Sequence, residues 1–386
     1  MARTLFLHIG SHKTGTTALQ QGLHRNRILL RACGATYVAA PTATHLHSYL
    51  GVPDLAAFLP AGLGVLDPDG LATRLAMAET ETVLASSENF SFFFQKPAIA
   101  ALADLLRPQF DTIRIVCYLR RQDRHAVSHH QEGAKPHRQV EGALWGHAPT
   151  ALPAPSDAHD LYLDYDRRLG LWADVFGDAA MAIQVYDRNL LKNGDIFADF
   201  LSVTGLDITG LLAVGDRNTS LGAAQTKVGH LMNGLAIKGA TAGTILARLS
   251  PEGRLLPSRP EAEAFQSRYT ASNHRLNQRF QVSPGADLFN ADYTDYPDIA
   301  ANDWTEDGAN AALLATLAQV NDLQPGLAAL TADDLRSAAV ALQSTAPEAA
   351  LRLITAAHAL RPSGPAIQKL KADLERKRDA APPTGL

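Results

Sequence analysis

Two glycines, a lysine and three threonines follow a short apolar run near the start of the chain. Residues 10–17 read GSHKTGTT, and residues 4–10 before them have the pattern of a buried strand. Glycines let backbone N–H groups approach an anion closely, and a helix that begins here presents further unpaired N–H groups. Lys13 adds a mobile cation, and Thr16 and Thr17 add hydroxyl donors. The stretch therefore predicts a binding loop for a phosphate or sulfate group.

The position of the lysine separates this loop from a Walker-type P-loop. A Walker loop needs Gly-Lys-Ser/Thr, with the lysine just inside the helix. Here Gly15 is followed by Thr16, and Lys13 lies two residues before Gly15, within the loop itself. This placement directs Lys13 to a nearer group, namely a single phosphate and whatever is bonded to it.

A second set of chemically useful residues follows the run TIRIVCYLR at 112–120. Arg120 ends that run, and Ser128 lies eight residues further on, in a predicted helix. An arginine fork can chelate a dianionic phosphate through two hydrogen bonds, and a serine in the next helix can donate another. The pair predicts a second phosphate site.

With these two motifs the chain resembles the bacterial type of sulfotransferase that uses 3′-phosphoadenosine 5′-phosphosulfate (PAPS). That family has Lys-Ser/Thr-Gly-Thr between its first strand and first helix, and HKTGTTALQ is similar to it. The family's 3′-phosphate site has an Arg at a strand end and a Ser eight residues later, as in YLRRQDRHAVSHH. The resemblance covers residues 4–222. It implies PAPS as the donor substrate, adenosine 3′,5′-bisphosphate (PAP) as the product, and no required metal.

The resemblance also implies roles for individual residues. The donor's 5′-phosphosulfate lies on the loop, with Lys13 at the bridging oxygen, and the adenine lies against Tyr186 after the run 181–187. A late loop, DRNTSLG at 216–222, closes over the 3′-phosphate. The full set of implied donor-site residues is Lys13, Thr14, Gly15, Thr16, Thr17, Arg120, Ser128, Tyr186, Arg217, Asn218 and Ser220.

Transfer of a sulfuryl group to an alcohol needs a base for the acceptor hydroxyl. Family members place a His or, in those that act on carbohydrates, a Glu after the second core strand. Here the run 82–87 leads into Glu88, and no His stands nearby. We predict Glu88 as the base, with its pKa raised by the phenylalanines in 90–94. The alternative is a carboxylate at a helix N-terminus or in a salt bridge. A glutamate at this position favours a carbohydrate or glycolipid acceptor.

Four histidines follow Arg120: His125, His129, His130 and His137. His125 and His129 have the i, i+4 spacing that can hold zinc, but no Glu follows in the required pattern and no Cys is near. We expect a polar wall of the substrate channel here rather than a metal site.

The predicted elements place these residues together. Strands at 4–10, 82–87, 112–120 and 181–187 alternate with helices at 18–33, 97–106, 161–176 and 196–203. The alternation predicts an α/β three-layer sandwich around a central, mostly parallel sheet, similar to P-loop NTPases. The loop after Gly10, Glu88, Arg120 and Tyr186 all fall at the carboxyl ends of predicted parallel strands, where such sheets bind ligands.

The chain divides by pattern into three parts. Residues 1–305 form the α/β domain, with a Pro-, Gly- and His-rich loop at 132–160 that is either a substrate-side flap or an inert insertion. Residues 306–380 form an α-helical extension with a single helical hairpin of the tetratricopeptide type, which packs on the main domain, on another copy of the chain or on a partner. Residues 381–386 are expected to be disordered.

The overall composition limits the classes of partner. Of 386 residues, 46% are hydrophobic, and 35 Lys and Arg against 39 Asp and Glu leave a net charge of −4, which argues against a nucleic acid polymer. The two cysteines, Cys33 and Cys117, predict reduced thiols in a cytoplasmic protein, and no apolar run is long enough to cross a membrane.

Two other functions fit parts of this pattern. One is a P-loop-type nucleotide kinase or hydrolase, which would need Mg²⁺ and a lysine that reaches a γ-phosphate. The other is a non-catalytic nucleotide-binding protein whose helical tail binds a partner.

Overall fold

The computed structural model divides the chain into two compact units, Met1–Ala309 and Asn310–Leu386. The residues described are 2–38, 73–136, 144–206, 209–212, 220–235, 237, 239–301 and 303–380.

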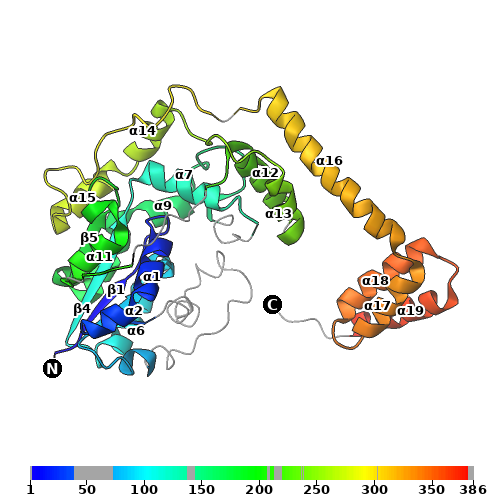
Figure 1. Ribbon diagram of the computed structural model, residues 1–386, viewed down its shortest axis with the longest axis horizontal. Coiled ribbons are helices and arrows are strands. Elements are labelled where there is room, and N and C mark those ends of the chain that lie inside the picture. Colours follow the sequence, from blue (N-terminus) through cyan, green and yellow to red (C-terminus); the bar gives the residue numbers. More distant parts are fainter. Residues whose placement is uncertain are drawn as a thin grey trace. The chain divides into compact units, whose positions relative to one another are not determined.

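The first unit is built on a five-stranded sheet in the order β2-β3-β1-β4-β5, with every pair of neighbours parallel (Figure 1). The strands are β1 (Thr4–His8), β2 (Ala35–Val38), β3 (Thr82–Ser86), β4 (Thr112–Leu119) and β5 (Met181–Val185). The predicted parallel α/β sheet is confirmed. The short strand β2 was not predicted, because ATYV follows directly on a helix and lacks an alternating pattern.

Both faces of the sheet are buried by helices. Leu5, Leu7 and Ile115 point to one core, which they share with α6 (Lys96–Leu106) and α10 (Tyr165–Phe176). Leu84 and Val116, at the alternate positions, point to the other core. That core includes α1 (Thr16–Arg25), α2 (Arg27–Ala32) and α11 (Ile196–Thr204). This alternation along strands makes the three-layer sandwich.

Two predicted helices are each divided into two by a polar side chain. The helix expected over 18–33 breaks at Asn26, whose side-chain amide donates to the carbonyl of Gly22 and pairs with the backbone of Leu212. The helix expected over 161–176 breaks between α9 (Asp157–Leu163) and α10, where Asp164 accepts from the N–H of Arg167 as an N-cap. Short polar side chains compete for backbone groups in this way, and the apolar spacing alone did not show it.

Further helices among the described residues of this unit are α7 (Gln122–Glu132), α12 (Ala223–Gly234), α13 (Gly239–Ala247), α14 (Arg259–Ser267) and α15 (Thr270–Phe280). Short 3₁₀ turns complete it: η1 (Glu88–Phe92), η2 (Asp178–Ala180) and η3 (Lys192–Gly194). The predicted loop at 132–160 therefore includes the end of α7 and the start of α9. Residues 137–143 of that loop lie outside the described ranges.

The second unit is helical, as predicted. Helix α16 (Glu306–Ala329) crosses the boundary between the units, and α17 (Ala332–Leu342), α18 (Pro347–Leu360) and α19 (Pro365–Ala380) share one core of alanine, isoleucine and leucine. The predicted boundaries and the tetratricopeptide likeness stay predictions, and residues 381–386 are not among those described. In the part of the chain that the structure describes, no helix has the length and apolar character needed to span a membrane.

Candidate functional site

The loop between β1 and α1 passes close to two other strand ends. Gly10 and Gly15 have φ angles of 101° and 75°, which favour glycine. A Cβ on Gly10 would stand 3.1 Å from Cα of Glu88, and a Cβ on Gly15 would stand 3.0 Å from the ring of Tyr186. Glycine is therefore needed at both positions so that the loop can lie against β3's end on one side and β5's end on the other.

The backbone N–H groups of residues 13–17 are available to a ligand. Among the described residues they donate to no acceptor, and the N-cap of α1 is Gly15, which has no side chain to satisfy them. The first turn of α1 has no acidic residue. A concentration of free N–H groups at a helix N-terminus is a binding site for an anion.

The three threonines of the loop differ in what they can do. Thr14 is fully buried, and its hydroxyl donates to the carbonyl of Ser11 at 2.6 Å, so its side chain holds the turn together. Only its backbone N–H remains for a ligand. Thr16 is buried and Thr17 is exposed.

Side chains of two helices form hydrogen bonds with the loop. From α9, the hydroxyl of Tyr162 accepts from the N–H of His12 at 3.2 Å and lies 3.0 Å from Nδ1 of the same residue. From α10, Nη2 of Arg168 donates to Oγ of Ser11 at 2.6 Å, although the side chain is only 1% exposed. Its guanidinium lies over the rings of Tyr162 and Tyr165, at 4.9 and 5.1 Å from their centroids. Neither Tyr162 nor Arg168 was predicted as a site residue, because each occupies a position that is typical of an amphipathic helix.

Lys13 forms an ion pair at the end of α7. Its Nζ lies 2.8 Å from Oε2 of Glu132, and Nζ of Lys135 lies 2.9 Å from the same oxygen. Burial lowers the pKa of Lys13, and the carboxylate opposes that shift. Burial also opposes ionisation of Glu132, but the two lysines hold its pKa at about 2. Glu132 was not predicted, because nothing but its place at the edge of the 132–160 loop marks it in the sequence.

Glu88 begins η1, directly after β3. It accepts a hydrogen bond from Nε2 of Gln20 at 2.7 Å. Burial works to raise its pKa, but the charge of nearby His12, the backbone N–H of Glu88 and the Gln20 amide together lower it below the usual value. The predicted raised pKa is therefore wrong. The phenylalanines that were expected to desolvate the carboxylate instead lie in the core of the sheet: Phe90, Phe92, Phe93 and Phe94.

Arg120 and Tyr186 lie on the other side of the loop. Nη1 of Arg120 donates to the carbonyl of Lys13 at 3.2 Å, and burial lowers the pKa of this arginine. Tyr186 extends β5, with its N–H bonded to the carbonyl of Leu119 at 2.7 Å, and its ring packs on Gly15. The structure thus brings Lys13, Arg120 and Tyr186 together.

Helix α7 presents a narrow half-exposed face beside them. Ser128 and Arg124 are partly exposed one turn apart, whereas most other positions of the helix are buried. Arg124 was not predicted; it is held by Asp295 at 3.0 Å and Asp187 at 3.9 Å. Of the predicted late loop, Arg217 and Asn218 lie outside the described residues, and Ser220 is exposed just before α12.

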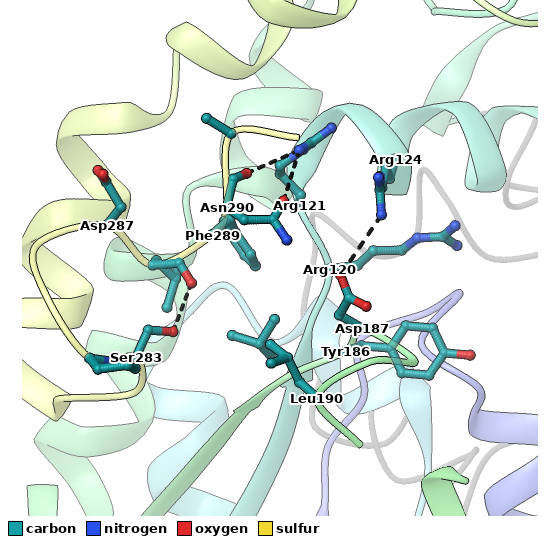
Figure 2. Close-up of a pocket in the computed structure, with 14 residues that line it drawn as sticks. Arg120, Arg121, Arg124, Tyr186, Asp187, Leu190, Ser283, Asp287, Phe289 and Asn290 are labelled. Carbon is teal, nitrogen blue, oxygen red and sulfur yellow. Dashed lines mark hydrogen bonds and ion pairs between the residues drawn. The ribbon is translucent and has the colours of Figure 1, made fainter. Parts of the chain in front are cut away.

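A cavity of about 330 Å³ lies next to Arg120 and Tyr186 (Figure 2). Its opposite wall is the segment 283–291, which includes Phe289 and Asn290. Arg121, paired with Asp123 at 2.7 Å, donates to the carbonyl of Asn290 at 3.0 Å and fastens that wall to α7. No motif in the sequence marks this segment.

The three described histidines of the predicted cluster do not form the wall of a channel. His125, His129 and His130 are at most 1% exposed and lie among aromatic rings such as Trp145. Burial lowers the pKa of His125 and His130, which keeps them neutral near pH 7. His137 lies outside the described ranges. Within those ranges no group of three or more His, Cys, Asp or Glu could hold a metal, and the absence of a metal requirement stays a prediction.

The described residues form an α/β protein with a parallel sheet and a glycine-containing loop at the end of its central strand. No protein-family model matches the chain. An uncharacterized protein of Archaeoglobus fulgidus is 31% identical over 96 residues, which is 25% of this chain. The chain spans only 23% of the length of that relative.

Among solved structures, a sulfotransferase from Alicyclobacillus acidocaldarius is similar over 73% of this chain and 98% of its own, with a TM-score of 0.43 and 14% identity. A likeness at this level says nothing about the chemistry of the present site.

Proposed function

We propose that this protein transfers a sulfuryl group from PAPS to a hydroxyl of a small molecule or glycan. The observation that supports the proposal most directly is the joint placement of Lys13, Arg120 and Tyr186 around the loop, with Arg120 bonded to the loop's own carbonyl. A loop that can bind one anion and an arginine supplied by the end of a different strand suit a donor with two phosphate groups.

In this proposal the loop N–H groups of residues 13–17 and the ammonium of Lys13 hold the 5′-phosphosulfate. Arg120 and Ser128 hold the 3′-phosphate, and Tyr186 lies against the adenine. Arg217, Asn218 and Ser220 close over the nucleotide. Lys13 stabilises the negative charge that develops on the bridging oxygen as the S–O bond breaks.

Glu88 is the proposed base for the acceptor hydroxyl. In-line transfer needs little more from the protein than positioning and charge stabilisation, as in phosphoryl transfer. The lowered pKa makes Glu88 a weaker base than the sequence suggested, but keeps it ionised at neutral pH. We also propose that the C-terminal helices bind another copy of the chain or a partner.

Calorimetric titration with adenosine 3′,5′-bisphosphate tests the donor site. We expect micromolar binding to the wild type and a loss of about 100-fold in Arg120→Ala, because a charge-assisted, bidentate phosphate contact is removed. Arg352→Ala removes an exposed arginine from α18 and serves as the matched control. ATP with Mg²⁺ is titrated alongside. Tight binding of ATP·Mg²⁺ without a response to the bisphosphate would overturn the proposal in favour of a kinase.

A further inference from the structure

The end of α7 places a carboxylate against the lysine of the anion-binding loop. The side chain of Glu132 is 10% exposed and that of Lys13 25% exposed, and their charged atoms are 2.8 Å apart. Lys135, one turn beyond Glu132, approaches the same oxygen at 2.9 Å. One negative charge is thus shared between two lysines, of which only Lys13 belongs to the loop.

Glu132 stands where a carboxylate is otherwise unfavourable. The C-terminal end of a helix carries partial negative charge, which repels an acidic side chain in the last turn. A largely buried carboxylate also loses its hydration. The two lysines compensate for both effects, so the local structure depends on this ion pair being made.

We propose that Glu132 occupies Lys13 in the absence of a ligand and competes with the ligand's anionic group for it, so that Glu132 sets the affinity and selectivity of the loop for anions. The identity of the ligand rests on the proposed function, but the competition does not. A phosphate or sulfate group that Lys13 contacts either displaces the carboxylate or lies close to its negative charge, and both oppose binding. A weakly charged anion gains too little from Lys13 to overcome this opposition, whereas a dianionic group gains more.

Lys135 makes this exchange feasible. Separating a buried ion pair by removing one partner is costly, because the remaining charge is left uncompensated. When Lys13 turns to a ligand, Glu132 keeps Lys135 as a partner. Lys135 should therefore favour ligand binding, and Glu132 should oppose it, although the two side chains contact each other.

The test is calorimetry with two probes, adenosine 3′,5′-bisphosphate and inorganic pyrophosphate. Removing the competing charge in Glu132→Gln should tighten binding by about fivefold to tenfold, the range of a partly screened ion pair. Lys135→Met should weaken binding several-fold. Glu79→Gln, at an exposed ion pair with Arg31, removes the same net charge elsewhere and should change nothing.

A double-mutant cycle locates the effect. If Glu132 acts through Lys13, the gain in Glu132→Gln disappears when Lys13→Met is already present. Equal or weaker binding in a folded Glu132→Gln, or a gain that persists without Lys13, would overturn the inference. If Glu132→Gln does not fold, Lys135→Met decides: unchanged binding in that variant contradicts the competition.

The two probes separate this inference from the proposed function. Pyrophosphate binding that tightens in Glu132→Gln, together with no binding of the bisphosphate, would sustain the competition and reject PAPS as the donor. If the bisphosphate binds and Glu132→Gln leaves its affinity unchanged, the proposed donor site would be sustained and the competition rejected.

Discussion

The edge of the sheet at the carboxyl ends of its strands and the C-terminal helices are stabilised in different ways. At the sheet edge, charged and polar side chains are buried, among them Arg168 and His8. The core of α17, α18 and α19 consists of alanine, isoleucine and leucine, and the described residues of these three helices include no buried polar side chain.

The two regions therefore differ in whether they bury charged and polar side chains, which oppose folding. Burying a charge or an unpaired polar group opposes folding, whereas small apolar side chains between helices suffice for a stable core. A region that keeps buried arginine and histidine therefore has a requirement beyond stability. This contrast can be tested in each region separately.

Ile354→Ala should destabilise the helical unit without altering the sheet edge. Ile354 is fully buried in the α17–α19 core, and truncating a buried isoleucine costs about 2–5 kcal/mol. Thermal unfolding should show a transition at lower temperature, while calorimetric binding of the bisphosphate stays unchanged. Leu360→Ala, at a position 59% exposed, is the control and should change little. Loss of bisphosphate binding in Ile354→Ala would show that the contrast between the regions is false.

Glu88→Gln should reduce turnover and leave donor binding nearly intact. With water as the acceptor, release of the bisphosphate from PAPS should slow by about 100-fold, at the low end for a general base because its lowered pKa limits its strength. The amide keeps the size of the side chain. A rate equal to that of the wild type would exclude Glu88 as the base, and Glu132→Gln measured in parallel would show whether the other carboxylate at the loop takes that role.

The third prediction concerns the stacked pair His130 and His230, whose ring centroids are 4.2 Å apart. The pKa of His130 is lowered to about 4 and that of His230 to about 3, mainly by burial and to a smaller extent by nearby His147. The unfolded chain therefore binds more protons below pH 6.5, so the free energy of unfolding falls as pH falls from 6.5 toward 4.

Denaturation at pH 7 and pH 5 measures this effect. His230→Gln should reduce the loss of stability between the two values by about 1–2 kcal/mol, since one buried neutral histidine is removed. The C-terminal helices have no buried histidine among their described residues, so their unfolding should respond less to pH. An unchanged pH dependence in His230→Gln would contradict the pKa assignment.

Part of the site could be predicted because its residues are adjacent in sequence. The glycines in residues 10–17 predict a tight turn. An arginine at the end of a predicted strand is expected to lie at the edge of the sheet where the strands end. The structure puts the loop, Glu88, Arg120 and Tyr186 at the carboxyl ends of β1, β3, β4 and β5. Their chemical roles stay predictions.

The rest of the site could not be predicted, because it depends on contacts between residues far apart in the chain. Lys13 forms a hydrogen bond with Glu132, which is 119 residues away in the sequence. Ser11 forms one with Arg168, which is 157 residues away. The pKa of Glu88 is lowered, whereas the sequence predicted that it is raised. The phenylalanines that follow Glu88 in sequence lie in the core, and Gln20 and His12 lie near the carboxylate instead.

From the sequence alone, the parallel sheet, the glycine-containing loop after its first strand and the helical C-terminal unit could be predicted, since each depends on local pattern: buried strand runs, glycine conformation and helical spacing. Only the tertiary structure decided which charge faces Lys13, which side chains hold the loop and what lies opposite Tyr186. These are set by how α7, α9, α10 and the segment 283–291 pack around the sheet edge, and electrostatic interactions depend on distance in space rather than along the chain.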